Sequence, residues 1–249
     1  MRNIKLTIEY DGTDFRGWQI QKQGERTVQQ ELKTAIQRLL NEDVSVIGSG
    51  RTDTGVHARG QVANFKTRAL LPASDIQRAL NAILPRDIVV RDLAEAPEHF
   101  HAQYSAKTKT YCYAILTRKE RSPLDSRYSM HFPFPLDLNA MRAAAKTLIG
   151  RHDFKSFQAS GSRRDIDTVR TISRLDIRQP DDYLWIEITA DGFLYKMVRN
   201  IVGTLLEIGA GRRASASMKD ILSQKSRCGA GDTAKPHGLT LLRVAYDVI

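Results

Sequence analysis

The densest group of unusual residues lies between positions 48 and 58, which read Gly-Ser-Gly-Arg-Thr-Asp-Thr-Gly-Val-His-Ala. Closely spaced glycines indicate tight backbone turns or the close approach of a ligand. Arg51 and Asp53 lie two residues apart, so an extended segment points both side chains to the same side. A carboxylate beside a guanidinium stays ionised well below neutral pH, which suits a nucleophile or an electrostatic group better than a general acid. A surface loop with a local ion pair is the alternative interpretation.

Other chemistries fit this segment poorly. Asp53-Thr54-Gly55 spells the triplet of aspartic proteases, but that mechanism needs two carboxylates that share a proton, and the sequence has no second triplet. The glycine spacing matches neither the dinucleotide-binding fingerprint nor a P-loop. The histidines form no zinc-ligand pattern with cysteines or acids, and no Gly-x-Ser-x-Gly elbow occurs. We therefore expect no metal, and a protease is disfavoured.

A second candidate region is residues 107–113, Lys-Thr-Lys-Thr-Tyr-Cys-Tyr. Strand alternation places Tyr111 and Tyr113 on one face, and an aromatic ring on a sheet is suited to stacking on a nucleic-acid base. The alternative is a place in the hydrophobic core, which we favour for Tyr113.

A third candidate is Arg199, within the stretch 192–200. Its helical angle places it at the edge of an apolar stripe, beside Tyr195. A charge in this position either extends to solvent over the apolar surface or turns into a cleft to meet a carboxylate. The composition of the segment does not choose between the two.

The chain is basic, with 38 Lys and Arg against 28 Asp and Glu and a formal net charge of +10. This surplus predicts an anionic partner, above all nucleic acid. A polar segment and the strand after it form a candidate track for phosphates, together with Arg2, Arg16 and Arg59. The arginines of that stretch are Arg163, Arg164, Arg170, Arg174 and Arg178. An ordinary solvated loop is the alternative.

Secondary structure must position these candidates, and hydrophobic periodicity predicts where it lies. Residues 4–10 alternate between apolar and polar, which predicts a strand with one solvated face. Thr27 and Gln30 predict a capping box at the start of a helix that continues to about residue 40. Further elements are expected as strands over 44–47, 62–66 and 87–93, with a helix from Ser74 or Asp75 to Leu84, ended by Pro85.

The same order of elements begins again after Pro97. The predicted elements are strands over 106–117, 168–177, 183–190 and 239–248, and helices over 138–149, 195–208 and 217–224. Each half thus combines about two helices with at least three strands, an α+β pattern typical of ferredoxin-like or RRM-like units. We predict two such halves, residues 1–103 and 104–249, with joined, mainly antiparallel sheets and a central active-site cleft.

The composition, 41% hydrophobic and 27% charged, is that of a globular protein and excludes a disordered, collagenous or coiled-coil chain. The first residues contain no apolar segment typical of a signal peptide, and no apolar run approaches the ~18 residues of a membrane span. Cys112 and Cys228 lie far apart, which indicates two reduced thiols. We therefore expect a soluble, cytoplasmic protein that does not contact membranes.

Several of these segments resemble motifs of the tRNA pseudouridine synthase A family. Gly50–Ala58 closely resembles the catalytic loop of that family, and residues 11–19, Asp-Gly-Thr-Asp-Phe-Arg-Gly-Trp-Gln, resemble its opening motif. Further matches, in chain order, are Phe100-His101-Ala102 with Ala106–Tyr113, His152–Phe157, Met197–Gly203 and Gly238-Leu239. These matches run in order over nearly the whole chain. The one departure is Thr54, where many relatives carry Ala.

The resemblance implies isomerisation of uridine to pseudouridine in the anticodon stem-loop of tRNA, at tRNA positions 38, 39 and 40. It implies no metal and no organic cofactor. It also implies a homodimer, with one tRNA lying across both subunits.

The resemblance assigns roles to individual residues as well. The catalytic aspartate of the family falls on Asp53, its active-site tyrosine on Tyr111, and the arginine that pairs with the aspartate on Arg199. The resemblance also implies that Tyr111, Arg51 and Leu239 bind the substrate uridine, with Leu239 lining the uracil pocket, and we add His57 of the same loop to this set. From the basic stretch described above, we expect Arg16, Arg59, Arg163 and Arg164 to bind the rest of the tRNA.

This chemistry is consistent with the short set of residues. The reaction breaks the N1–C1′ bond, rotates the uracil and joins C5 to C1′, so it requires an ionised nucleophile or base. Asp53 held by Arg199 supplies one, whether it attacks the base, attacks C1′ or removes a ribose proton. The rival hypothesis is a non-catalytic RNA-binding module with two RRM-like units. The Gly-Arg-Thr-Asp loop argues against it, because binding alone needs no acid in a basic cleft.

Overall fold

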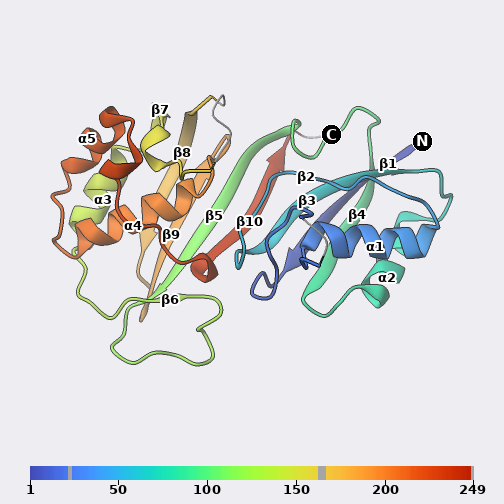
Figure 1. The fold of residues 1–249 in the computed structure, drawn as a ribbon, viewed down its shortest axis with the longest axis horizontal. Helices are drawn as coiled ribbons and strands as arrows, with labels where there is room; N and C mark the ends of the chain where they lie inside the picture. Colours follow the sequence, from blue (N-terminus) through green and yellow to red (C-terminus); the bar gives the residue numbers. More distant parts are fainter. Residues whose placement is uncertain (22–23, 162–166, 248–249) are drawn as a thin grey trace. The chain divides into compact units, whose positions relative to one another are not determined.

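The computed structural model describes residues 1–21, 24–161 and 167–247, and the chain forms two compact units (Figure 1). Unit 1 consists of Met1–Lys107 and Thr240–Ile249, and unit 2 of Thr108–Leu239. We predict residues 104–249 as the second half, whereas the structure groups Thr240–Ile249 with unit 1. The reason is that β10 (Leu239–Tyr246) pairs in parallel with β3 (His57–Thr67) of that unit.

Unit 1 is built on a sheet with mainly antiparallel pairing. Its other strands are β1 (Arg2–Tyr10), β2 (Ile47–Gly48) and β4 (Ile88–Ala96). The order is β4-β1-β3-β10, and β2 also pairs with β3. The apolar residues of β1 are buried in alternation, as predicted. The strand predicted over 44–47 is wrong in extent, since only Ile47 of that range is in β2.

The helices of unit 1 are α1 (Val28–Leu40) and α2 (Ala73–Ile83), which pack together (Figure 1). The hydroxyl of Thr27 accepts a hydrogen bond of 3.3 Å from the backbone N–H of Gln30, which confirms the first half of the predicted capping box. The Gln30 side chain does not complete the box but donates to the Thr34 hydroxyl at 3.1 Å. The helix start was predictable because a cap depends on neighbouring residues alone.

Strand β3 is buried on both of its faces, because the segment after β4 lies across the sheet. The side chain of Asn64 donates to Asn3 at 2.9 Å and accepts the backbone N–H of Ala102 at 2.9 Å. Asn3 in turn donates to the carbonyl of Phe100 at 2.8 Å, and the hydroxyl of Tyr246 donates to the carbonyl of Ala102 at 2.7 Å. The Phe-His-Ala motif therefore closes the second face of the unit 1 sheet.

Unit 2 contains an antiparallel sheet in the order β5-β9-β8-β7. Its strands are β5 (Ala106–Leu116), β6 (Met130–His131), β7 (Gly150–Asp153), β8 (Val169–Arg178) and β9 (Tyr183–Ala190). The short β6 pairs in parallel with β5. The hairpin predicted between β8 and β9 is confirmed, with Asp181 in a left-handed conformation at φ 52°.

Three helices gather on unit 2 (Figure 1). They are α3 (Leu138–Lys146), α4 (Met197–Gly209) and α5 (Ser217–Gln224), accompanied by the 3-10 helices η1 (Lys155–Phe157), η2 (Arg227–Gly229) and η3 (Pro236–Gly238). The predicted start of α4 at Tyr195 is wrong. Lys196 has a φ of 57°, which is outside the right-handed helical region, so the helix begins at Met197, two residues after the predicted start.

The α+β class with a mainly antiparallel sheet is confirmed. Within the described ranges, no helix combines the length and apolar character that crossing a bilayer requires. In those same ranges, no three His, Cys, Asp or Glu side chains are grouped so that they could hold a metal ion.

Candidate active site

Asp53 lies half-buried in the loop between β2 and β3. Its neighbour Thr52 is buried, and the Thr52 and Tyr10 hydroxyls share a hydrogen bond of 2.8 Å. The carbonyl of Thr52 accepts the backbone N–H of Trp18 at 3.1 Å. Arg51, on the other side of Thr52, is exposed. The inward anchoring of Thr52 thus leaves the two flanking charged side chains nearer the surface.

Residues 11–19 pack against this loop through two glycines. A Cβ on Gly12 would lie 2.0 Å from the carbonyl oxygen of Val56. Gly17 has a φ of +86°, and its Cβ would lie 2.6 Å from the carbonyl oxygen of Thr52. Both approaches are open only to glycine. Since Thr52 and Val56 flank the aspartate, the opening motif fixes the loop backbone on both sides of it.

The sequence predicts the start of this opening motif as the turn after the first strand, but it does not predict the packing of the motif on the Asp53 loop. A third close contact explains its tryptophan: the indole of Trp18 is buried, and a Cβ on Gly48 would lie 2.5 Å from the indole ring. A signal was present in the sequence, because two glycines five residues apart, beside a large aromatic residue, indicate a backbone that packs closely on another segment.

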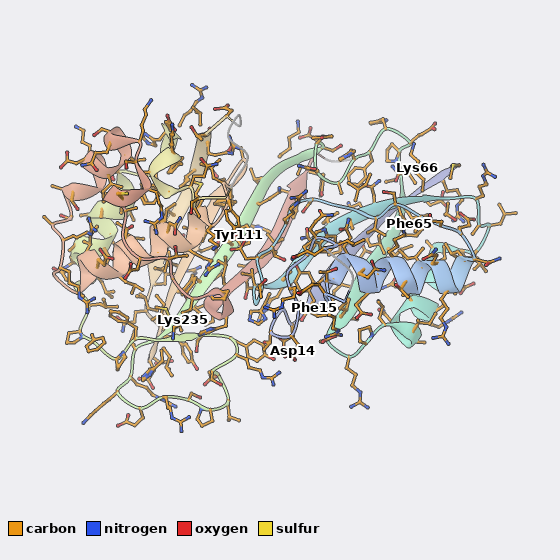
Figure 2. All side chains as sticks on the ribbon, in the orientation of Figure 1. Asp14, Phe15, Phe65, Lys66, Tyr111 and Lys235 are labelled. Carbon is orange, nitrogen blue, oxygen red and sulfur yellow. The ribbon has the colours of Figure 1, made fainter. Side chains whose placement is uncertain are left out.

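His57 is the first residue of β3 and is 4% exposed. The backbone N–H of Gly12 donates to its Nδ1 at 3.0 Å. The same Nδ1 lies 3.1 Å from a carboxylate oxygen of Asp11, which also accepts the N–H and hydroxyl of Thr13. His57 therefore joins the loop to the opening motif; Figure 2 labels Asp14 and Phe15 of that motif.

The arginines expected to contact tRNA are exposed where the structure describes them. Arg51 in the loop and Arg59 in β3 both reach solvent. Arg16 is 64% exposed at its side chain and forms an ion pair of 3.1 Å with Glu25. All three belong to unit 1, as Asp53 does.

The other basic candidates differ in status. Arg2 is bound to the protein itself, since it donates to Glu95 at 2.6 Å and to the carbonyl of Ala69 at 2.6 Å. Arg163 and Arg164 lie outside the described residues. Their assignment to tRNA binding stays a prediction.

In unit 2, β5 carries both candidate tyrosines, of which Figure 2 labels Tyr111. Tyr111 is 8% exposed, and its ring meets the ring of Phe193 edge-on, with centroids 5.1 Å apart. Tyr113 is fully buried, and its hydroxyl donates to the carbonyl of Lys235 at 2.6 Å. Burial raises the pKa of Tyr113, with the positive charge of Arg199 acting in the opposite direction. The prediction that Tyr113 belongs to the core is confirmed.

Arg199 lies in the first turn of α4 and is half-buried. Its side-chain Nε donates to the carbonyl of Ala234 at 2.7 Å, and its own carbonyl accepts the N–H of Ala234 at 3.1 Å. The expected neighbour Tyr195 precedes the helix and is 43% exposed. The guanidinium is therefore oriented by the segment before β10, and its charge lies near Tyr113.

Asn200 holds that segment on the helix. It is fully buried, and its amide donates to the carbonyl of Phe157 at 2.7 Å. Its Oδ1 accepts the Thr233 hydroxyl at 2.6 Å and the Arg227 guanidinium at 3.2 Å. The Asn200 side chain, in the Met197–Gly203 motif, thus connects this motif with the His152–Phe157 motif and with the chain that runs from η2 to η3.

Leu239 is 5% exposed at the start of β10. The preceding Gly238 packs on Tyr113, because a Cβ there would lie 2.7 Å from the tyrosine ring. Gly238 therefore sets the position of Leu239 relative to β5. The structure accordingly groups the predicted residues in two places. Asp53, Arg51 and His57 share the loop of unit 1, whereas Tyr111, Arg199 and Leu239 lie around Tyr113 in unit 2.

Comparison with known proteins identifies the family. The sequence model described as tRNA pseudouridine synthase matches residues 6–105 and 144–247. A tRNA pseudouridine synthase A of Thermoanaerobacter sp. (strain X514) is 49% identical over 246 residues, which is 99% of this chain and 100% of that protein. A tRNA pseudouridine synthase A 2 of Clostridium perfringens (strain 13 / Type A) is 46% identical over the same shares of both chains.

A solved structure, the archaeal box H/ACA sRNP Nop10-Cbf5 complex, aligns with 82% of this chain and 44% of that chain at 12% identity and a TM-score of 0.37, a likeness too weak to bear on function. The match of the family model over both parts of the chain, and the full-length relatives, are decisive. The chain belongs to the tRNA pseudouridine synthase family.

Proposed function

We propose that Asp53 is the catalytic carboxylate with which this enzyme isomerises uridine to pseudouridine at positions 38, 39 and 40 of the tRNA anticodon stem-loop. Isomerisation of uridine in tRNA is the activity of the family. The observation that supports the assignment of Asp53 is the clamping of its loop by Gly12 and Gly17. The close packing fixes the loop backbone on both sides of Asp53. Such positioning is needed for a catalytic group, but not for a loop that only connects two strands.

The reaction rearranges bonds within one nucleoside. The N1–C1′ bond breaks, the uracil turns, a C5–C1′ bond forms, and the proton displaced from C5 leaves while N1 gains one. Asp53 serves as the nucleophile or base that starts this sequence, and the ionised form is required in either role. The half-buried position of Asp53 is consistent with this role, since it reaches a substrate without full desolvation of the carboxylate.

Tyr111 and Arg199 act on the same uridine in this proposal. The Tyr111 ring stacks on the extruded uracil, and its hydroxyl is available to relay the C5 proton. Arg199 supplies the positive charge that keeps the aspartate ionised. Leu239 lines the apolar floor that retains the detached base and excludes water. The edge-on contact with Phe193 and the two bonds to Ala234 support these roles, because they hold the tyrosine and the arginine in single orientations.

The uridine must leave its stack to be reached. Arg51, exposed beside Asp53, fills the gap or holds a phosphate of the flipped nucleotide, and His57 anchors the loop that carries both. Arg16 and Arg59 contact the surrounding tRNA backbone, as do Arg163 and Arg164. Replacing Arg163 and Arg164 together with Gln should weaken tRNA binding and flatten its salt dependence, and an unchanged salt slope would assign them to an ordinary solvated loop.

The remaining expectations belong to this proposal as well. They are a pair of ferredoxin-like halves with joined sheets around a central cleft, a homodimer that binds one tRNA across both subunits, and a cytoplasmic location. Their support is the family resemblance. Light scattering of the purified protein with and without tRNA measures the stoichiometry, and a monomer that binds tRNA one to one would contradict the dimer.

The test of the catalytic assignment compares the protein with its Asp53→Asn variant. Each is incubated with unmodified tRNA and no added cofactor, and pseudouridine is located by cyanoethylation and mass spectrometry. We expect adducts in the anticodon stem-loop with the unchanged protein and none with Asp53→Asn, while tRNA binding survives. The exposed Asp92 on β4, changed to Asn, is the matched control. Full activity of Asp53→Asn, or loss of binding in step with activity, would overturn the assignment.

A further inference from the structure

The segment that contains the Phe-His-Ala motif also presents an exposed aromatic ring. Tyr104 is 81% exposed, whereas the other Phe, Tyr and Trp side chains in the described part of unit 1 are buried or half-buried. The two apolar residues of the motif, Phe100 and Ala102, are buried and pack with Val62. The hydrophobic core thus explains these two residues of the segment, but it does not explain Tyr104.

The Tyr104 ring is held in one orientation by its neighbour. It stacks on the imidazole of His101, with ring centroids 4.2 Å apart and an interplanar angle of 26°. Nδ1 of that imidazole accepts the backbone N–H groups of Gln103 and Tyr104, each at 3.2 Å. A single exposed side chain needs no explanation by itself. This ring differs because one flat face lies against a fixed imidazole and the other face is open to solvent.

The turn that carries the two rings is closed and anchored. The backbone N–H of His101 donates to the Ser105 hydroxyl at 3.1 Å, and its carbonyl accepts the N–H of Ser105 at 2.9 Å. Between them, the Ala102 N–H donates to the Asn64 side chain at 2.9 Å, and the Ala102 carbonyl accepts the Tyr246 hydroxyl at 2.7 Å. The ring pair therefore stands on a backbone bonded to the unit 1 sheet, so a ligand that stacks on it orders little that is mobile.

The surroundings of the ring favour a nucleic-acid base over a protein partner. The other exposed residues between positions 98 and 107 are polar or charged: Glu98, His99, Gln103 and Lys107. A protein interface needs a contiguous apolar core, which one ring among polar groups does not provide. A base needs only a flat aromatic face on which to stack. The net charge of +10 also favours a polyanion.

We infer that Tyr104 binds an unpaired base of the tRNA by stacking, with His101 supporting the opposite face of the ring. In a duplex, neighbouring bases cover both faces of each base, so the ring selects a base in a loop or a single-stranded end. The choice of a base other than the target uridine rests on the proposed function, which assigns that uridine to Tyr111. The stacking site itself does not depend on the assignment of Asp53.

The first test measures tRNA binding by Tyr104→Ala and Tyr104→Phe. Loss of the ring should weaken binding about tenfold, as for the loss of one base stacked on an aromatic side chain. Tyr104→Phe keeps the ring and should bind normally. The salt dependence of log Kd should not change in Tyr104→Ala, because the substitution removes no charge. Leu70→Ala is the control, since Leu70 is 90% exposed on the same unit and has no ring.

Two results of this test would overturn the inference. One is normal affinity in Tyr104→Ala, and light scattering then shows whether the ring instead lies between two copies of the chain. The other is a shallower salt slope in Tyr104→Ala, which would assign the loss to phosphate contacts.

His101→Ala tests the support of the ring. It leaves Tyr104 in place but removes the imidazole beneath it, so binding should weaken by a few fold. The double variant with Tyr104→Ala should bind no more weakly than Tyr104→Ala alone, because the support has no function without the ring. Additive losses would overturn the assignment of His101 as a positioning residue.

The second test identifies the base. Full-length tRNAs carry one abasic nucleotide at a time at their unpaired positions. With Tyr104 intact, one position other than the target uridine should cost about tenfold in affinity, and with Tyr104→Ala the same position should cost nothing further. Equal losses in both proteins at every position, or a loss specific to Tyr104 at the target uridine alone, would overturn the inference.

All binding is measured in the Asp53→Asn background, so that the substrate stays intact. Turnover in that background would contradict the proposed role of Asp53 and leave the stacking result standing. Conversely, an inactive Asp53→Asn protein whose binding shows no effect of Tyr104→Ala would refute only the stacking site. The two proposals therefore fail separately.

Discussion

Arg199 and Ala234 are joined by two hydrogen bonds of opposite sense: the arginine side chain donates to the alanine carbonyl at 2.7 Å, and the alanine N–H donates to the arginine carbonyl at 3.1 Å. The pair connects the first turn of α4 to the segment that leads into β10. Rotation of the guanidinium away from Ala234 would break one of these bonds. The side chain is therefore preorganised before any substrate arrives.

Arg199→Ala should reduce single-turnover formation of pseudouridine by at least about a hundredfold, because it removes the charge assigned to stabilise the aspartate. Binding of tRNA should change by no more than a few fold. Arg199→Lys keeps the charge but loses the directed hydrogen bond to Ala234. Its rate of pseudouridine formation should therefore lie between the rates of the unchanged protein and of Arg199→Ala. Quenched-flow assays with cyanoethylation give these rates, and a rate within tenfold of normal in Arg199→Ala would exclude the role.

Gly17→Ala should lower both the stability and the turnover of the enzyme. The added methyl group meets the carbonyl of Thr52 at 2.6 Å and forces an L residue to a φ of +86°. The strain should cost about 1–3 kcal/mol, and the shifted loop should slow the reaction about tenfold or more. Urea unfolding and single-turnover kinetics measure the two effects.

The control for this change is Gly24→Ala. Gly24 has a φ of +95°, but among the described residues nothing lies within 4 Å of the Cβ it would gain. Gly24→Ala should lose stability through the same unfavourable φ, but its rate of pseudouridine formation should stay normal. Equal rates in Gly17→Ala and Gly24→Ala would show that the opening motif does not position the catalytic loop.

Asn200→Ala should destabilise the protein by about 3 kcal/mol, because it leaves the Thr233 hydroxyl, the Arg227 guanidinium and the Phe157 carbonyl without their buried partner. Urea unfolding measures the loss against Gln103→Ala, an exposed amide on unit 1. A loss below about 1 kcal/mol would show that these groups find other partners.

Lys109→Met should stabilise the protein at pH 7 by about 1–2 kcal/mol, since the pKa of Lys109 falls from 10.5 to about 8 on folding. Between these values the unfolded chain holds a proton that the folded chain has released, so this lysine makes the unfolding free energy rise with pH. The advantage of the Met variant should accordingly shrink from pH 8 to 10.5. Urea unfolding across this range measures it, with Lys107→Met as control, and a pH-independent advantage would contradict the shift.

Local signals were enough to predict several elements from the sequence. The cap at Thr27 depends on Gln30 three residues away, and the burial of Tyr113 follows from the alternation of one strand. The family motifs predicted the activity, and they also led to the assignment of Asp53, which stays a prediction. These predictions used neighbours in sequence or a pattern spread along the chain, and the structure or the family comparison confirms the cap, the core tyrosine and the family.

Contacts between distant segments were not predictable. Whether the Arg199 side chain extends into solvent or turns inward is decided by its hydrogen bond to the carbonyl of Ala234. The need for glycine at position 17 arises from the close approach of the Thr52 carbonyl. The start of α4 was misplaced because Lys196 adopts a left-handed conformation that its residue type does not favour. Such features depend on packing partners that no local window contains.

The division of unit 1 along the chain has a consequence for biosynthesis. Its last strand, β10, is synthesised only after the whole of unit 2. Until then His57 and Ala58 of β3 lack their β10 partners, and Ala102 lacks the hydroxyl of Tyr246 that covers its carbonyl. The Asp53 loop, although encoded near the N-terminus, thus leads into a strand end that pairs only with a segment made after unit 2.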